Sequence, residues 1–90
     1  ESLRELFKIG FGPSSSHTMV AKAASKIKEQ YPNASRFEVE LYGSLALTGK
    51  GHLTDYIIKQ TLGKQTIVRF KSDRLPYHPN GMKFYVYQDE

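Results

Sequence analysis

Two short segments hold most of the side chains that could take part in chemistry. In the first, five consecutive side chains carry a hydroxyl or an imidazole, and they follow the turn pair Gly12-Pro13; they are Ser14, Ser15, Ser16, His17 and Thr18. A helical pattern comes next, and the free N–H groups and dipole of a helix N-terminus favour negative charge. A polar helix cap would use fewer such side chains. We weigh an anion-binding or carboxylate-binding loop equally against a cap cluster.

The second segment is Gly49-Lys50-Gly51-His52, which places a cation and an imidazole between glycines. It fails the spacing of a phosphate-binding P-loop. A lone histidine is usually structural, but this one is expected in a loop just ahead of a helix. We therefore predict that His52 binds a ligand or transfers a proton, and that Asp55 orients its ring. Thr48 and Lys50 are secondary candidates.

A third segment, His78-Pro79-Asn80-Gly81, has the composition of a β-turn. The turn interpretation is the stronger one. Even so, His78 and Asn80 would stand at the mouth of a strand, where binding groups are common.

The composition excludes several classes of function. The net charge of +4 is scattered along the chain, which favours a solvated basic surface over a nucleic-acid interface. Neither a bilayer-spanning run nor a signal peptide is evident, so we expect a cytoplasmic protein with no membrane partner. There is no cysteine, and the three histidines lack zinc-site spacing, so we expect the chain to bind no metal.

Hydrophobic periodicity predicts the elements that position these segments. Leu3, Leu6 and Phe7 indicate a short helix, and a second helix is expected from about Ser16 to Gln30. Strict alternation predicts a strand over residues 37–42, followed by a loop over 45–51.

Thr54 or Asp55 would cap a third helix that ends at Leu62, with Gly63 just beyond it. Strands are expected over 66–71 and 82–88, with a turn region over 72–81. The expected order is α-α-β-α-β-β. It gives an α+β fold with a small mixed or antiparallel sheet and helices packed on one side.

Three separated segments together resemble one known family. They are residues 8–18 (KIGFGPSSSHT), 41–55 (LYGSLALTGKGHLTD) and 78–82 (HPNGM), in this order. The chain resembles the β domain, or β subunit, of the bacterial iron–sulfur L-serine dehydratases, over essentially all 90 residues. That domain is similar to the allosteric substrate-binding domain of some phosphoglycerate dehydrogenases. The resemblance identifies residues 1–90 as a single β domain that is shorter than is usual, so part of the fold is expected to be absent.

The resemblance implies a lyase activity that converts L-serine to pyruvate and ammonia. In that family a four-iron (4Fe-4S) cluster is held by cysteines of a separate α domain, which agrees with the absence of cysteine here. An open iron would act as a Lewis acid on the serine hydroxyl while a base removes the Cα proton. The expected partners are this α domain or subunit, L-serine, and a second copy in a dimeric assembly.

The same resemblance assigns roles to individual residues. His52 would be the base, and His17 is the second catalytic candidate. The remaining candidates would bind the substrate carboxylate or line the pocket, namely Ser14, Ser15, Ser16, Thr18, Thr48, Lys50, His78 and Asn80.

The chain departs from the family after Thr18, where a hydrophobic residue followed by Gly-Pro is usual. Here Met19-Val20-Ala21 follows instead. Either the helix starts differently in this protein or residues are missing at this point. A second hypothesis from another class is a sensing module that binds serine or a related anion and regulates a neighbouring domain. A generic anion-binding interaction domain is a weaker third.

Overall fold

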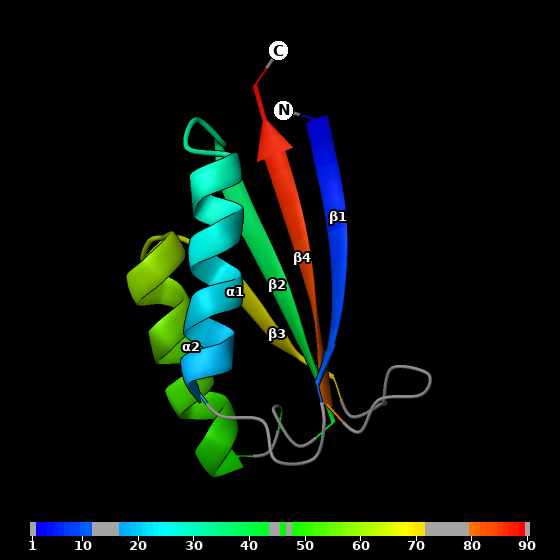
Figure 1. The fold of residues 1–90 in the computed structure, drawn as a ribbon, viewed down its shortest axis with the longest axis vertical. Coiled ribbons are helices and arrows are strands. Elements are labelled where there is room, and N and C mark those ends of the chain that lie inside the picture. Colours follow the sequence, from blue (N-terminus) through cyan, green and yellow to red (C-terminus); the bar gives the residue numbers. More distant parts are fainter. Residues whose placement is uncertain (1, 12–16, 44–45, 47, 72–79, 90) are drawn as a thin grey trace.

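The computed structural model describes residues 2–11, 17–43, 46, 48–71 and 80–89, which form two helices and four strands. The element order is β1 (Ser2–Phe11), α1 (His17–Gln30), β2 (Arg36–Gly43), α2 (Thr48–Leu62), β3 (Ile67–Phe70) and β4 (Asn80–Gln88). The strands make one sheet in the order β1-β4-β2-β3. Both helices cover the same face of this sheet (Figure 1).

The sheet is mixed, as the sequence predicts. β4 pairs antiparallel with both β1 and β2, whereas β2 and β3 are parallel and are joined through α2. Parallel neighbours need a crossover, and α2 provides it. Gly63 ends α2 with a φ of 118°, a value that favours glycine, so its predicted place after the helix is confirmed.

The core lies between the helices and the sheet. It consists of one stripe from each helix and alternate residues of the two central strands, namely Val20, Ala24, Ile27, Ile58, Leu62, Phe37, Val39, Leu41, Met82, Phe84 and Val86. The helix expected from about Ser16 is confirmed, because α1 begins at His17 and packs its apolar face on β2 and β4.

The first predicted helix is wrong, because residues 2–11 form β1. Leu3, Leu6 and Phe7 have helical spacing, but they lie in register opposite β4 over nearly its whole length. Phe7 and Ile9 face the helix-covered side, opposite Phe84 and Met82. Pairing with a long neighbouring strand satisfies the backbone and partly buries Phe7 and Ile9 against the core, and this outweighs a weak local preference.

The start of the third predicted helix, expected near Thr54 or Asp55, is also wrong. α2 begins at Thr48, so Lys50 and His52 lie on the helix and not in a loop before it. Thr54, expected as a cap, is fully buried within the helix. At the other end of the predicted turn region, Asn80 and Gly81 already belong to β4, where Gly81 pairs with Gly10 and Tyr42.

Candidate functional site

His17 is the first residue of α1 and is half-buried. Its Nδ1 atom is buried and has no hydrogen-bond partner among the described residues. A buried polar atom without a partner costs free energy, so in a native protein Nδ1 of His17 calls for a partner beyond the described residues, such as a bound molecule or a water. His17 is followed by the first backbone N–H groups of α1. These groups have no carbonyl partner within the helix. Thr18 follows and is exposed, whereas Ser14, Ser15 and Ser16 lie outside the described residues.

His52 lies in the second turn of α2 and is exposed. Its ring meets Phe70 of β3 edge-on, with ring centroids 6.5 Å apart and an interplanar angle of 69°. The expected pairing of His52 with Asp55 is wrong. The Asp55 carboxylate instead forms an ion pair with Lys59, one turn further along the helix, with 3.2 Å between Oδ1 and Nζ.

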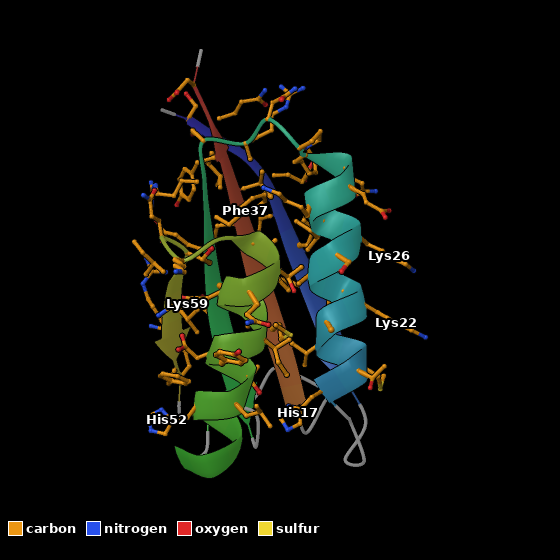
Figure 2. The ribbon with its side chains drawn as sticks, turned by 90° about the vertical axis from the view of Figure 1, so that its left-hand side faces the viewer. His17, Lys22, Lys26, Phe37, His52 and Lys59 are labelled. Carbon is orange, nitrogen blue, oxygen red and sulfur yellow. The ribbon has the colours of Figure 1, made fainter. Side chains whose placement is uncertain are left out.

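Both histidines lie at the same end of the molecule, which we call the histidine end (Figure 2). They belong to neighbouring helices but face different sides. His17 lies between the two helices, whereas His52 lies on the outer side of α2, toward β3. The described residues therefore bring the two segments to one end without forming a single hollow around both rings.

Other predicted site residues lie at the boundary of the described chain. Thr48 and Lys50 are in the first turn of α2. The structure describes their backbone but not their side chains. Asn80 begins β4 opposite Phe11 and Gly43, and its side chain is also outside the description. His78 is outside the described residues. These backbone positions bring the starts of α2 and β4 close to the ends of β1 and β2.

A second polar region, which the sequence analysis missed, lies on the sheet face that neither helix covers. This open face carries Arg36, Glu38, Glu40 and Tyr42 of β2, with Arg69 and Lys71 beside them and Lys83, Tyr85 and Tyr87 of β4 opposite. Glu38 and Glu40 are buried, with only 5% and 9% of their surfaces exposed. Buried carboxylates need partners, and the neighbouring strands supply them.

Glu40 is the centre of this network. Its Oε1 accepts hydrogen bonds from the hydroxyls of Tyr42 (2.9 Å) and Tyr85 (2.7 Å). Its Oε2 lies 3.8 Å from Nη1 of Arg69 and 3.7 Å from Nζ of Lys71. Glu38 forms ion pairs with Arg36 and Arg69. Both carboxylates are therefore held in place by side chains from three strands.

This environment shifts two pKa values. Burial raises the pKa of Glu40, but the hydrogen bonds from Tyr85 and Tyr42 and the charges of Lys71 and Arg69 outweigh it, so the pKa lies below its usual value. The hydrogen bond to Glu40, with burial, raises the pKa of Tyr85 to about 12. The Glu40 carboxylate thus stays charged and the Tyr85 hydroxyl stays neutral near pH 7.

The sequence contains a signal for this network. Glu38 and Glu40 alternate along one strand, and Arg69 and Lys71 alternate along another. In paired strands these sets fall on one face. Two residues of the expected basic surface, Arg69 and Lys71, therefore contact a buried carboxylate while their side chains stay 41% and 43% exposed.

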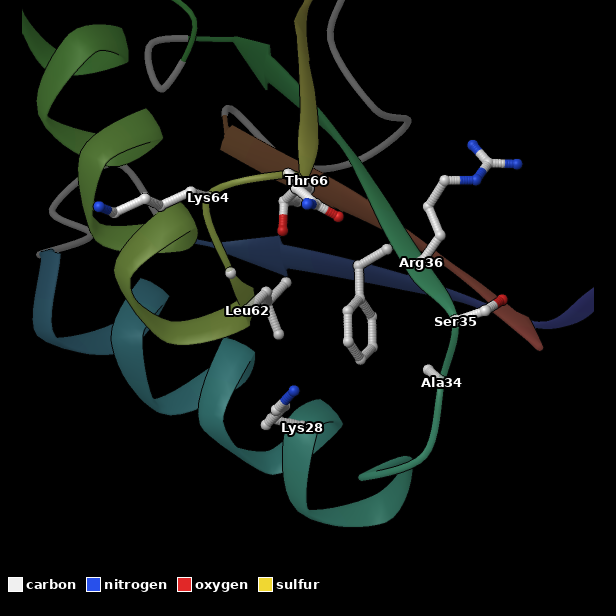
Figure 3. Close-up of a pocket in the computed structure, with 10 residues that line it drawn as sticks. Lys28, Ala34, Ser35, Arg36, Leu62, Lys64 and Thr66 are labelled. Carbon is white, nitrogen blue, oxygen red and sulfur yellow. The ribbon is translucent and has the colours of Figure 1, made fainter. Parts of the chain in front are cut away.

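A cavity of about 550 Å³ lies at the far end of the molecule, beside the C-terminal ends of the helices (Figure 3). Phe37 and Leu62 contribute apolar walls, and Lys28 lies at its margin. Figure 3 shows the side chains of Arg36 and Lys64 pointing away from it. Of the predicted site residues that the structure describes, none lines this cavity.

Metal ligands are scarce in the described ranges. No group of three or more His, Asp or Glu side chains that could hold a metal ion occurs there. The whole chain contains no cysteine. In the same described ranges, no helix is both long and apolar enough to cross a membrane.

Comparison with known proteins gives a consistent result. A family model described as the serine dehydratase beta chain matches residues 2–66. The L-serine dehydratase 1 of Escherichia coli is 40% identical over 82 residues, covering 83% of this chain and 18% of that protein. The L-serine dehydratase of Helicobacter pylori (strain 26695) is 48% identical over 59 residues, covering 60% of this chain and 13% of that protein.

The L-serine dehydratase of Streptomyces coelicolor is 29% identical over 133 aligned residues, covering 99% of this chain and 29% of that protein. Because 133 exceeds the 90 residues of this chain, the alignment contains positions that the chain lacks. No solved structure matches significantly. The chain thus spans less than a third of the length of these relatives.

Proposed function

Because this chain belongs to the serine dehydratase beta chain family, we propose that it is the β portion of an L-serine dehydratase. This lyase converts L-serine to pyruvate and ammonia. The names of the relatives support the reaction. We propose that this chain acts as one component, a single β domain over residues 1–90, which is inactive alone. We further propose that the assembly is dimeric and lies in the cytoplasm.

The residues of this chain do not fit an iron–sulfur cluster. Cluster ligands are cysteine thiolates, and the chain has none. The described residues also lack a group of three metal-binding side chains. We therefore assign the cluster to the cysteines of a separate α domain or subunit. This chain would contribute side chains that bind, orient and deprotonate the substrate.

The proposed carboxylate site is the start of α1. An N-terminal helix end offers free N–H donors, and the hydroxyls of Ser14, Ser15, Ser16 and Thr18 would add to them. The unpartnered Nδ1 of His17 supports this assignment, because a carboxylate oxygen would satisfy it when the ring is protonated at that atom. Of all the observations, this orphaned imidazole nitrogen at a helix N-terminus carries the most weight.

His52 is the proposed base that removes the Cα proton of L-serine. Its exposure on α2 supports the role, because a base must reach a substrate that is bound between domains. The contact with Phe70 limits the orientations that the ring can adopt. Lys50 and Thr48, in the same helix start, would line the pocket with His78 and Asn80. Because His17 and His52 face different sides of α2, the proposal requires the partner domain to complete the hollow between them.

Reconstitution tests this function directly. The chain is mixed with the cluster-loaded, cysteine-bearing partner, and pyruvate formation from L-serine is measured. We expect turnover only when both components are present. Pyruvate formation by the partner alone, at the rate of the mixture, would contradict the proposal.

Calorimetry separates the catalytic role from a sensing role. The catalytic proposal predicts weak or undetectable binding of L-serine to the isolated chain, because the substrate site is completed by the partner. Tight binding of L-serine to the isolated chain would favour a regulatory sensing module instead.

A further inference from the structure

The two edges of the sheet differ in length and in side chains. β1 is ten residues long and, within the described residues, pairs only with β4. β3, at the other edge, has four residues, and charges lie there on Arg69 of this strand and on Lys71 directly after it. Long unpaired edge strands invite pairing with another chain, whereas short or charged edges discourage it. The structure therefore leaves β1 as the edge that is open to association.

A groove of about 510 Å³ runs along β1, between this strand and α1. Its lining is mostly apolar and includes Phe7, Ile9 and Met19, the last of which is 45% exposed. Lys22 and Lys26 also line it and point away from α2 (Figure 2). The groove thus suits a strand that presents apolar side chains together with a carboxylate.

β1 itself has these features. On the helix-covered face it carries Glu5, Phe7 and Ile9, which lie opposite Val86, Phe84 and Met82 of β4. We propose that two copies of this chain pair β1 to β1, antiparallel about a two-fold axis, and form one continuous eight-stranded sheet. This inference builds on the dimeric assembly proposed above and is independent of the serine site.

Charge selects the register of this pairing. A two-fold axis normal to the sheet keeps each face on its own side, so residues of the same face must meet. An axis at Glu5 or at Lys8 would place like charges directly opposite each other. An axis at Leu6 would bring Arg4, which lies at the irregularity of β1 between Leu3 and Glu5, close to Lys8 of the second copy. An axis at Phe7 avoids these repulsions and pairs residues 3–11, whereas an axis at Ile9 avoids them but would pair residues 7–11 alone.

With the axis at Phe7, Glu5 of one copy lies opposite Ile9 of the other. α1 starts beside the end of β1 and runs back along it (Figure 1), and Lys22 lines the groove together with Ile9. The Glu5 carboxylate of each copy therefore meets the Lys22 ammonium of the other. On the open face, Leu6 meets Lys8, whose methylene groups can cover it.

Sedimentation equilibrium of the chain tests the interface. The expected mass is twice the 10.3 kDa of one copy. Lys22→Glu places two carboxylates together at each of two symmetric sites and should raise the dimer dissociation constant about tenfold. The double variant Lys22→Glu with Glu5→Lys should restore it. Lys64→Glu, with the same change in charge at an exposed site far from β1, should have no effect. A monomer, or a failure of the second substitution to restore association, would overturn the proposal.

Disulfide trapping tests the register independently, because the chain has no cysteine of its own. The variant carrying both Leu6→Cys and Lys8→Cys should form covalent dimers under mild oxidation, whereas Leu6→Cys alone should not. Ile67→Cys on β3 is a matched control, since Ile67 is 43% exposed and Leu6 is 38% exposed. Circular dichroism confirms that each variant is folded. Trapping through Ile67→Cys, or through Leu6→Cys alone, would contradict this interface.

Discussion

The open face of the sheet and the histidine end are both polar, but they differ in how many of their polar groups have partners. Glu40 on the open face accepts hydrogen bonds from two tyrosine hydroxyls and lies near the charged groups of Arg69 and Lys71. At the histidine end, Nδ1 of His17 is buried without a partner in the described chain, and the ring of His52 meets only the edge of Phe70. A network that satisfies itself stabilises the fold, whereas the unpartnered Nδ1 of His17 agrees with the substrate site proposed at the start of α1.

The largest expected effect concerns the histidine end. His52→Ala in the assembled enzyme should lower the rate of pyruvate formation by about 10²–10⁴-fold, the usual contribution of a general base. Stability should change little, because the side chain is exposed. Gln60→Ala, an exposed control on the same helix, should retain full turnover. If His52→Ala matched this control in turnover, His52 would not be the base.

Glu40→Ala should have the opposite profile. It leaves the hydroxyls of Tyr42 and Tyr85 without their acceptor, so the free energy of unfolding should fall by about 2–3 kcal/mol. Turnover per folded molecule should remain unchanged. Urea denaturation measures the loss, and Glu29→Ala, at an exposed site, should stay within about 0.5 kcal/mol of the parent chain.

The same carboxylate gives a pH dependence with a defined sign. Because the folded-state pKa of Glu40 is lowered from 4.5, its contribution to stability is complete above that pH and is lost as the pH falls through the lowered pKa. Glu40→Ala should therefore flatten the acid limb of the stability curve. An unchanged acid limb would show that this carboxylate is not stabilised in the folded state.

Tyr85→Phe should have a smaller effect, about 1–2 kcal/mol, because Glu40 keeps its other partners. The pKa of Tyr85 is raised from 10.0 to about 12, so its stabilising contribution is complete below pH 10 and is lost as the pH rises toward 12. The variant should lose less stability across this interval than the parent chain. Tyr56→Phe, at a tyrosine 58% exposed on α2, should retain the parental decline.

The smallest expected effect lies between the two regions, on α2. Asp55→Asn removes a half-exposed ion pair to Lys59 and should cost only about 0.3–0.5 kcal/mol. Thermal unfolding of the variant beside the parent chain measures this difference. A loss as large as that of Glu40→Ala would mean that exposed and buried ion pairs contribute equally here.

Sequence reasoning succeeded where local pattern and tertiary environment agree. α1 and the central strand β2 follow their periodicity, and Gly63 ends α2 as its type suggests. It failed for β1, because Leu3, Leu6 and Phe7 have helical spacing but the strand is fixed by pairing with β4, more than 70 residues later. Local periodicity carries no information about such a distant partner.

The candidate site shows the same limit. The residue types of Ser14–Thr18 and of the segment that ends at His52 identified two regions, and α1 and α2 carry their described histidines to one end of the molecule. The direction of the His52 ring could not be predicted, because it depends on where α2 begins. Starting at Thr48, the helix turns His52 toward Phe70 and away from His17. The buried carboxylates were missed because each was considered within its own strand.

Imidazole NMR of the assembled protein, with only this chain isotopically labelled, tests the central claim most directly. The chain has three histidines, so few ring signals need to be assigned. Addition of L-serine should shift the ring signals of both His17 and His52. The ring signals of Tyr85, whose hydroxyl donates to Glu40, should stay unchanged. Ring signals of His17 and His52 that stay fixed at saturating L-serine would contradict a substrate site at the histidine end.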